Sequence, residues 1–423
     1  MMVLLRYGAA LVLVTASLGQ LNRLFIGDAS NIVLYANDLF VGILAAAYVA
    51  HVLTVRRSWR IPWPLVWVGL FTAIAGISLL LGSSALRQPE LLVSAFYLLR
   101  YVSYLVLFFL PFDDVVYASS PRERLKSLKW WSWVLLLAVI LVAASGFIQL
   151  FVLPDLAVLA KYGWDPHYNR LVTTFLDPNF AGCYLSIGVA LSLGLALDPL
   201  TRLRSRLVLS VITLLLLLAI ILTFSRSGYL MLAIVVSVIA VWRARWLLLV
   251  GGLIGLASFA LVPRVQQRVE GAFNRDETAS IRVISWQNSL RIASDYPLLG
   301  VGFNSYRYAQ DRYGIVSLEQ SGNAGAGADS SWLFVLATTG ALGLVGYSAA
   351  YFSFAWTSLQ SLVHSKEPFA QSFALMFLAV LVGLGVASQF NNGLFYIWIL
   401  ELLWPLGGLA LGLSKSVRDE GVV

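Results

Sequence analysis

The chain of 423 residues is strongly apolar, with 59% hydrophobic and 12% charged residues and a net charge of +8. Soluble domains carry roughly 25% charged residues, so these few charges could not cover a soluble protein of this length. Apolar runs of about 18 residues or more, long enough to cross a bilayer, recur from end to end. The single cysteine, Cys183, excludes an internal disulfide framework. Composition therefore predicts an all-α integral membrane protein.

The hydropathy pattern predicts about twelve transmembrane helices. The first apolar run carries Arg6 and lacks a convincing cleavage site, so we interpret it as a signal anchor. We expect residues 1–423 to form a single polytopic membrane domain. The expected spans are 7–22, 32–54, 62–82, 91–112, 130–152, 178–197, 206–224, 228–242, 245–262, 330–356, 368–389 and 392–413.

Basic residues cluster in alternate short loops, whereas the intervening loops hold isolated ones. By the positive-inside rule, both termini are then cytoplasmic. Most of the positive charge faces anionic membrane lipid from inside, so no nucleic-acid partner is expected. The clusters are Arg56, Arg57 and Arg60; Arg122, Arg124, Lys126 and Lys129; Arg202, Arg204 and Arg206; Arg243 and Arg245; Lys366; and Lys415 and Arg418.

Two external segments, 153–177 and 263–329, are longer than the other connections, and the second is the only stretch that resembles soluble protein. Within it, residues 280–297 are predicted to form a helix with Ser280 as its N-cap. Arg282 and Arg291 lie on opposite sides of the apolar stripe of this helix, so they are not expected to serve the same pocket. A turn-rich segment, "YPLLGVGFNSY", and a Gly/Ala linker, "SGNAGAGAD", follow.

Polar residues that could carry chemistry gather at the external face. Arg226 lies in "TFSRSGYL", a turn too short to leave the membrane interface. There a guanidinium can fork two phosphate oxygens of a lipid diphosphate; the alternative is that it only anchors a helix end to lipid phosphates. The other candidates near this face are Arg170, Asp177, Asn179, Trp286, Arg291 and Asp329.

Arg100 lies within the fourth expected span, where a lone charge costs about 2.5–3.5 kcal/mol. Counted from the external helix ends, Asp38 lies at a similar depth and Glu401 is close. Arg100 is therefore expected either to form a buried ion pair or to contact substrate. His167 could be an external base or simply an exposed loop residue.

Several kinds of site are not expected. No His/Cys/Asp cluster has metal-ligand spacing, and no Gly-rich loop follows a strand, because no convincing strand is predicted. Neither a metal nor a cofactor is expected. Without a soluble nucleotide-binding domain, ATP hydrolysis and nucleotide-sugar donors are also disfavoured. If the protein is an enzyme, its donor is expected to come from the membrane.

Four blocks in this order, "RLVTTFLDPNFAG", "TFSRSGYLMLAI", "SIRVISWQNSLRIASDYPLLGVGFNSY" and "DSSWLFVLATTGALGLVG", span residues 170–346. Together they resemble the O-antigen ligase and O-antigen polymerase family of bacterial envelope glycosyltransferases. Each motif alone is weak, but their order on the expected topology is informative. The first five spans match only in hydropathy.

The resemblance implies a GT-C-like architecture in the bacterial inner membrane. It also implies a metal-independent, inverting transfer on the periplasmic face, from a saccharide on undecaprenyl diphosphate to a hydroxyl of a glycan or glycolipid. By position, Arg226 and Arg282 match the family arginines that clamp the diphosphate. Arg170 matches a further family arginine. The resemblance also suggests a chain-length regulator or a flippase as a partner.

One residue departs from the family pattern. Ligases that attach polymer to lipid A core usually carry a histidine, interpreted as general base, where this chain has Asp329. A carboxylate can still deprotonate a hydroxyl if burial raises its pKa, although Asp329 could instead be a helix cap. The change favours a polymerase of repeat units over a ligase or a protein O-oligosaccharyltransferase. A lipid-glycan flippase is the main non-enzyme alternative.

Overall fold

The computed structural model describes residues 2–24, 33–55, 61–274, 276–318 and 327–419, the last five of these by their backbone alone. Most of this part of the chain is helical. Its only strands are β1 (Arg23–Leu24) and β2 (Leu34–Tyr35), which pair antiparallel between the first two spans. The all-α membrane class is thus confirmed, and the expectation of no strand is wrong only for this two-residue pair.

The helices follow one another with short connections. Those before residue 178 are α1 (Met2–Thr15), η1 (Ala16–Asn22), α2 (Ala36–Val55), α3 (Trp63–Gly82), η2 (Ser83–Ala85), α4 (Gln88–Ser103), α5 (Val106–Val116), α6 (Pro121–Val152), η3 (Ala157–Tyr162) and η4 (Thr173–Phe175). The later ones are α7 (Pro178–Ala196), α8 (Leu203–Thr223), α9 (Arg226–Arg243), α10 (Trp246–Leu261), α11 (Pro263–Phe273), α12 (Glu277–Asp295), α13 (Tyr306–Arg312), α14 (Ser331–His364), α15 (Pro368–Ala387), η6 (Gly393–Phe395) and α16 (Ile397–Asp419).

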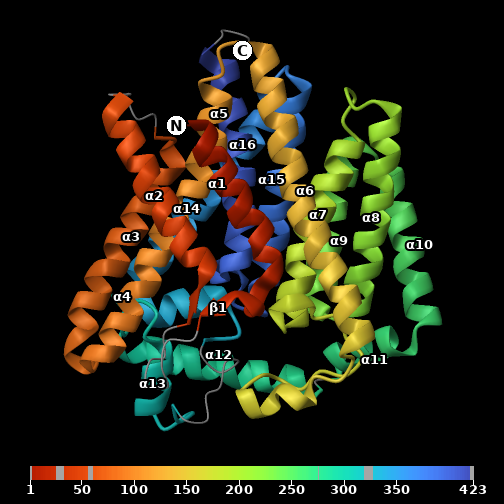
Figure 1. The fold of residues 1–423 in the computed structure, drawn as a ribbon. Helices are drawn as coiled ribbons and strands as arrows, with labels where there is room; N and C mark the ends of the chain where they lie inside the picture. The colour runs from red at the N-terminus through yellow and green to blue at the C-terminus, as the bar shows by residue number, and fades with distance from the viewer. Residues whose placement is uncertain (1, 25–32, 56–60, 275, 319–326, 420–423) are drawn as a thin grey trace.

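Within the described residues, 11 helical segments are long and apolar enough to cross a membrane, or up to 12 if α10 and the bent segment after it count as one span. The expected number of spans is therefore confirmed. The helices differ in how much of their surface other helices cover. The span Ile397–Ser414 of α16 is buried along its whole length, whereas α10 has no buried residue and lies at the edge of the bundle (Figure 1).

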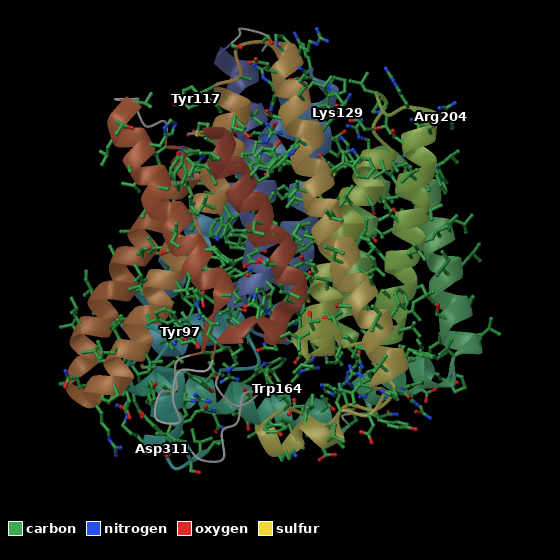
Figure 2. The ribbon with its side chains drawn as sticks, in the orientation of Figure 1. Tyr97, Tyr117, Lys129, Trp164, Arg204 and Asp311 are labelled. Atoms are coloured by element: carbon green, nitrogen blue, oxygen red, sulfur yellow. The ribbon has the colours of Figure 1, made fainter. Side chains whose placement is uncertain are left out.

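Helices α11, α12 and α13 lie across one end of the bundle, which we call the loop end (Figure 1). Helix α1 begins, and α16 ends, at the opposite end. Figure 2 shows Trp164 and Asp311 at the loop end and Lys129 and Arg204 at the other. Of the basic clusters, Arg56, Arg57 and Arg60 lie outside the described residues, as does most of the Gly/Ala linker.

The expected span boundaries differ from the observed helices at several ends; α14, for example, continues to His364, beyond the expected end at residue 356. Span 91–112 is divided into α4 and α5, which meet at Tyr104 and Leu105. Helix α6 begins well before the expected span, where the hydroxyl of Ser120 accepts a hydrogen bond from the Glu123 amide at 3.3 Å. Because the first turn of α6 is polar, hydropathy alone could not detect where this helix begins.

Helix α14 is broken at Gly340, whose φ is 66°. The segment 297–302 fills this break with backbone hydrogen bonds. The Val301 amide donates to the Ala337 carbonyl at 3.1 Å, and the Ala341 amide donates to the Pro297 carbonyl at 2.8 Å. A Cβ atom on Gly340 would lie 2.2 Å from the carbonyl carbon of Leu298. Only glycine therefore permits this approach, which gives interrupted backbone its partners inside the protein.

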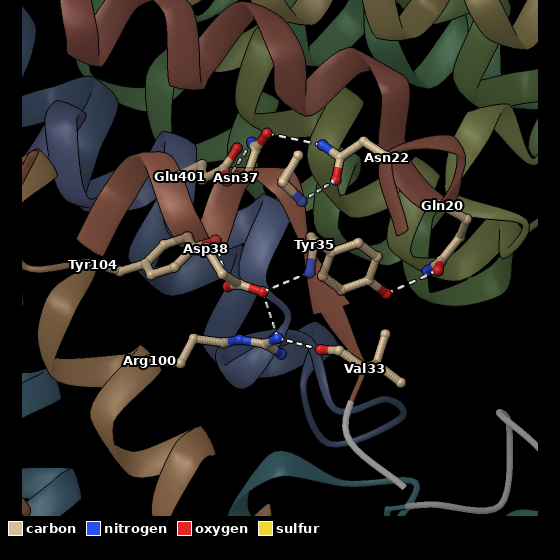
Figure 3. Close-up of polar contacts among 10 residues, drawn as sticks. Gln20, Asn22, Val33, Tyr35, Asn37, Asp38, Arg100, Tyr104 and Glu401 are labelled. Atoms are coloured by element: carbon tan, nitrogen blue, oxygen red, sulfur yellow. Dashed lines mark hydrogen bonds and ion pairs between the residues drawn. The ribbon is translucent and has the colours of Figure 1, made fainter. Parts of the chain in front are cut away.

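The predicted pairing of Arg100 with Asp38 is confirmed (Figure 3). The guanidinium Nη2 donates to Asp38 Oδ2 at 2.6 Å and also to the Val33 carbonyl, and both charged side chains are only 5% exposed. The Tyr104 hydroxyl donates to Asp38 Oδ1 at 3.1 Å. Glu401 joins the same region through Asn37, whose Nδ2 donates to Glu401 Oε1 at 2.9 Å. Arg100 is thus paired within the bundle.

Breaking this ion pair should destabilise the protein. Replacing either Arg100 or Asp38 alone by Ala leaves the other charge buried, so each single change should cost about 3–5 kcal/mol. The double change should recover part of that loss, because no unpaired charge remains. Thermal unfolding in detergent would measure the cycle, with the exposed Arg122→Ala as a neutral control. Strictly additive losses would contradict the energetic coupling.

Candidate active site

Arg226 is the first residue of α9, and glycines and hydroxyls hold it in place. The Ser225 hydroxyl caps the helix by accepting from the Gly228 amide at 3.2 Å, and it donates to Asn179 Oδ1 at 2.8 Å. A Cβ atom on Gly182 of α7 would lie 2.9 Å from the Gly228 Cα atom. Helices α7 and α9 therefore pack with their backbones in close contact, and Asn179 ties α7 to the turn that carries Arg226.

Asp177 is the N-cap of α7. Its Oδ1 accepts from the amides of Asn179 and Phe180 at 2.6 and 3.1 Å. Burial raises the pKa of Asp177, while these hydrogen bonds and the nearby Arg170 and Arg282 oppose the rise. Asp177 and Asn179, which were predicted to contact substrate, thus both have hydrogen-bond partners within the protein. Asp177 also lies within electrostatic range of Arg282.

Arg170 is 9% exposed and binds the C-terminal end of α8. Its Nε donates to the Thr223 carbonyl at 2.9 Å, and its Nη2 donates to the Phe224 carbonyl at 3.1 Å. A cation is favourable there, because helix C-termini leave carbonyls without partners. Burial lowers the pKa of Arg170 to about 9, and the positive charges of Arg268 and Arg264 add to this effect. Arg170 thus stabilises the turn that leads to Arg226.

The guanidinium of Arg226 makes a forked ion pair with Asp276. Its Nη1 donates to Asp276 Oδ2 and its Nη2 to Asp276 Oδ1, both at 3.1 Å. Asp276 is also the N-cap of α12, because its Oδ1 accepts from the Ala279 amide at 2.9 Å. The prediction that Ser280 caps this helix is therefore wrong, since the helix begins earlier, at Glu277. Asp276 was not among the sequence candidates.

Arg282, on the second turn of α12, is partly buried, and no hydrogen bond or ion pair engages it within the described part of the chain. Burial lowers its pKa, and the carboxylate of Asp329 opposes that shift. Arg226, Asp177 and Asp276 also act on it electrostatically. The structure thus brings Arg282 close to Arg226 and Asp329, with its donors available.

Asp329 is held by α12 and does not cap α14. Its amide donates to Ser285 Oγ at 3.1 Å, and its carbonyl accepts from Trp286 Nε1 at 3.4 Å. The cap of α14 is Ser330, whose hydroxyl accepts from the Leu333 amide at 3.3 Å. Burial raises the pKa of Asp329, while Arg282 and Ser285 oppose the rise. The alternative interpretation of Asp329 as a helix cap is therefore wrong.

The remaining candidates have other surroundings. Trp286 contacts the Asp329 backbone and lies with its ring centroid 5.8 Å from that of Phe390. Arg291, later on α12, has its guanidinium carbon 5.5 Å from the ring centroid of Tyr313. Arg100 belongs to the buried network with Asp38. Arg282 and Arg291 therefore have different neighbours, in agreement with the prediction that they do not serve the same pocket.

Two further arginines lie on α11, one turn apart, and were not predicted. Arg264 donates to the carbonyls of Asn169 and Tyr168, and Arg268 acts electrostatically on Arg170 and Asp276. Their spacing of four residues in "PRVQQRVEG" could have indicated a basic helix face.

Burial and the nearby Arg170 lower the pKa of His167 to about 4, so this imidazole is neutral at physiological pH.

This geometry defines a class of protein: a multi-pass membrane protein with arginines and carboxylates gathered where helices α7, α9 and α14 meet a helical loop. Within the described residues, no group of three or more His, Cys, Asp or Glu side chains could hold a metal ion. The guanidinium groups of the site can instead bind an anion, and its carboxylate can accept a proton.

Residues 209–348 match the family model described as O-antigen ligase. The matched stretch contains Arg226, Asp276, Arg282 and Asp329, and it supports the O-antigen ligase and polymerase family expected from the sequence. Residues 209–348 are therefore similar to an O-antigen ligase domain, and that family indicates O-antigen ligase-type glycosyltransferase activity on lipid-linked glycans. No curated protein matches the chain.

Proposed function

We propose that this protein transfers a saccharide from undecaprenyl diphosphate to a sugar hydroxyl, with inversion at the anomeric carbon, and that it polymerises glycan repeat units. The observation that carries the proposal is the convergence of Arg226, Arg282 and Asp329 from three separate elements. In this step the acceptor hydroxyl attacks the anomeric carbon and gives its proton to Asp329. The bond to the diphosphate breaks, and the lipid diphosphate leaves with the electron pair.

The arginines suit the departing group. Preorganised cations stabilise the charge that develops on a leaving diphosphate without reorganising during the reaction. Arg226 uses two of its five N–H donors on Asp276, which leaves three for a ligand. Arg282 has all of its donors available, and its partial burial strengthens its attraction to an anion.

The residue at position 329 favours polymerisation, because the family ligases usually carry histidine there. A second candidate is a ligase that attaches polymer to lipid A core, which the description of the matching family model favours. One assay separates the two functions. Purified protein is given a lipid-diphosphate oligosaccharide with and without a lipid A core acceptor, and the products are examined for chain growth or for transfer to the core.

The first prediction for this site concerns the two arginines. Arg226→Gln and Arg282→Gln should each lower turnover by about 10²–10³-fold, as expected for removal of a group that stabilises transition-state charge. Lys should rescue poorly, because an ammonium cannot fork two oxygens. The matched control is Arg312→Gln on α13, whose side chain binds the Ala85 carbonyl. Full activity of either Gln variant would remove that arginine from the mechanism.

The second prediction concerns Asp329. Asp329→Asn should lower turnover by about 10²–10⁴-fold while donor affinity and thermal stability stay near wild type, because Ser330 caps the helix. Ser330→Ala should instead cost about 0.5–2 kcal/mol of stability. An unchanged rate in Asp329→Asn would exclude it as the base.

The pH profile gives an independent check. The base acts when ionised, and the pKa of Asp329 lies above its ordinary 3.8 because of burial, with Arg282 opposing and Asp177 and Asp165 reinforcing the rise. The wild-type rate should therefore fall as the pH drops through that raised pKa, and Asp329→Asn should lack this limb.

We also propose that the loop end faces the periplasm of a bacterial inner membrane and that both termini are cytoplasmic. The basic residues at the opposite end, such as Lys129 and Arg204, support this orientation (Figure 2). A cysteine introduced at Asp311 should react with an impermeant thiol reagent on spheroplasts. One introduced at Arg204 should react only after permeabilisation. Labelling in the reverse pattern would contradict the orientation.

A further inference from the structure

The carboxylate of Asp276 connects two helices that are separate in the sequence. Both of its oxygens accept from Arg226 at the start of α9, at 3.1 Å each. Its Oδ1 also accepts from the Ala279 amide at 2.9 Å, which caps α12. One side chain therefore joins the beginning of the helix that carries Arg226 to the beginning of the helix that carries Arg282.

The chain makes room for this carboxylate in α11. A Cβ atom added to Gly271 would lie 2.7 Å from Asp276 Oδ2, so only glycine leaves the oxygen where it is. The Asp276 amide donates to the Gly271 carbonyl at 3.0 Å, which fixes the backbone as well. The position of Asp276 is thus determined from three sides, by α9, α11 and α12.

The ion pair does more than join two helices. The side chains of Arg226 and Asp276 remain 15% and 31% exposed, so neither group is fully enclosed by the protein. A forked pair fixes the plane of a guanidinium. Because α12 begins at the same carboxylate, the pair also fixes where Arg282 leaves its helix, less than two turns further on.

We propose that Asp276 is a positioning residue that holds Arg226 and Arg282 as one receptor for the donor diphosphate, an inference that rests on the proposed function. The carboxylate repels the ligand to some extent, but Arg226 keeps three N–H donors and Arg268 adds positive charge nearby. Although partial burial acts to raise the pKa of Asp276, the Ala279 hydrogen bond and Arg226 lower it, so the group is ionised at neutral pH.

The test measures binding of undecaprenyl diphosphate without a saccharide to the full chain in lipid nanodiscs. Asp276→Ser keeps a good N-cap residue but loses the fork to Arg226, and it should weaken binding by about tenfold, within the usual coupling between residues in contact. The matched control is Glu277→Gln, which removes an adjacent exposed carboxylate and should change the affinity less than about twofold. In an Arg226→Gln background, Asp276→Ser should cause no further loss.

A second variant tests the position of the carboxylate while keeping its charge. Gly271→Ala should also weaken binding, because the new methyl group displaces Asp276, although Ala is the better helix former. A role confined to helix stability predicts the opposite. This variant decides the matter if Asp276→Ser fails to fold.

Unchanged or tighter binding in both variants would overturn the inference, and tighter binding would identify Asp276 as a competitor of the ligand. The proposed function has a separate point of failure. If Arg226→Gln and Arg282→Gln both bind undecaprenyl diphosphate as wild type does, the diphosphate site itself is wrong. If they bind weakly while Asp276→Ser and Gly271→Ala do not, only the positioning role is wrong.

Discussion

The backbone pairing between segment 297–302 and the broken helix α14 holds the loop end together. Backbone amides and carbonyls at membrane depth need partners, so an interrupted helix and an irregular segment are stable there because they pair with each other. The segment follows α12 directly, so its anchoring restricts where α12 can lie across the bundle (Figure 1). Helix α12 in turn holds Asp329 through Ser285 and Trp286. Helix α12 therefore positions both Arg282, which it carries, and Asp329, which it binds.

Backbone strain gathers in the same region. Within the described chain, the non-glycine residues with positive φ are Asn169, Thr173, Leu176, Phe224 and Asn304. All of them lie between spans, and such conformations cost about 1–3 kcal/mol each. The guanidinium of Arg170 offsets part of this cost at Phe224, because it binds the two carbonyls at the end of α8. Arg170 thus supports the turn to Arg226.

The sequence was a good guide to which residues gather and a poor guide to what each one binds. Arg226, Arg282 and Asp329 lie together, as their positions at helix ends implied. The cap of α12 was assigned incorrectly and that of α14 was left open, because "DETAS" and "DSS" each offer several residues that cap helices equally well. Asp276 was preferred over Ser280 because it also receives Arg226, which lies 50 residues earlier. A partner so distant in the sequence cannot be predicted from the residues next to the cap.

By itself, the sequence determined the membrane class, the approximate number of spans and which short connections between spans carry clustered basic residues. Each of these follows from the transfer of side chains between water and lipid, which depends mainly on composition along one segment. The pairing of Arg100 with Asp38 was also accessible, because few buried groups at that depth could neutralise a charge. The fork between Arg226 and Asp276 and the break at Gly340 were decided only in the tertiary structure. Their stability depends on distances and burial that arise when segments far apart in the chain come into contact.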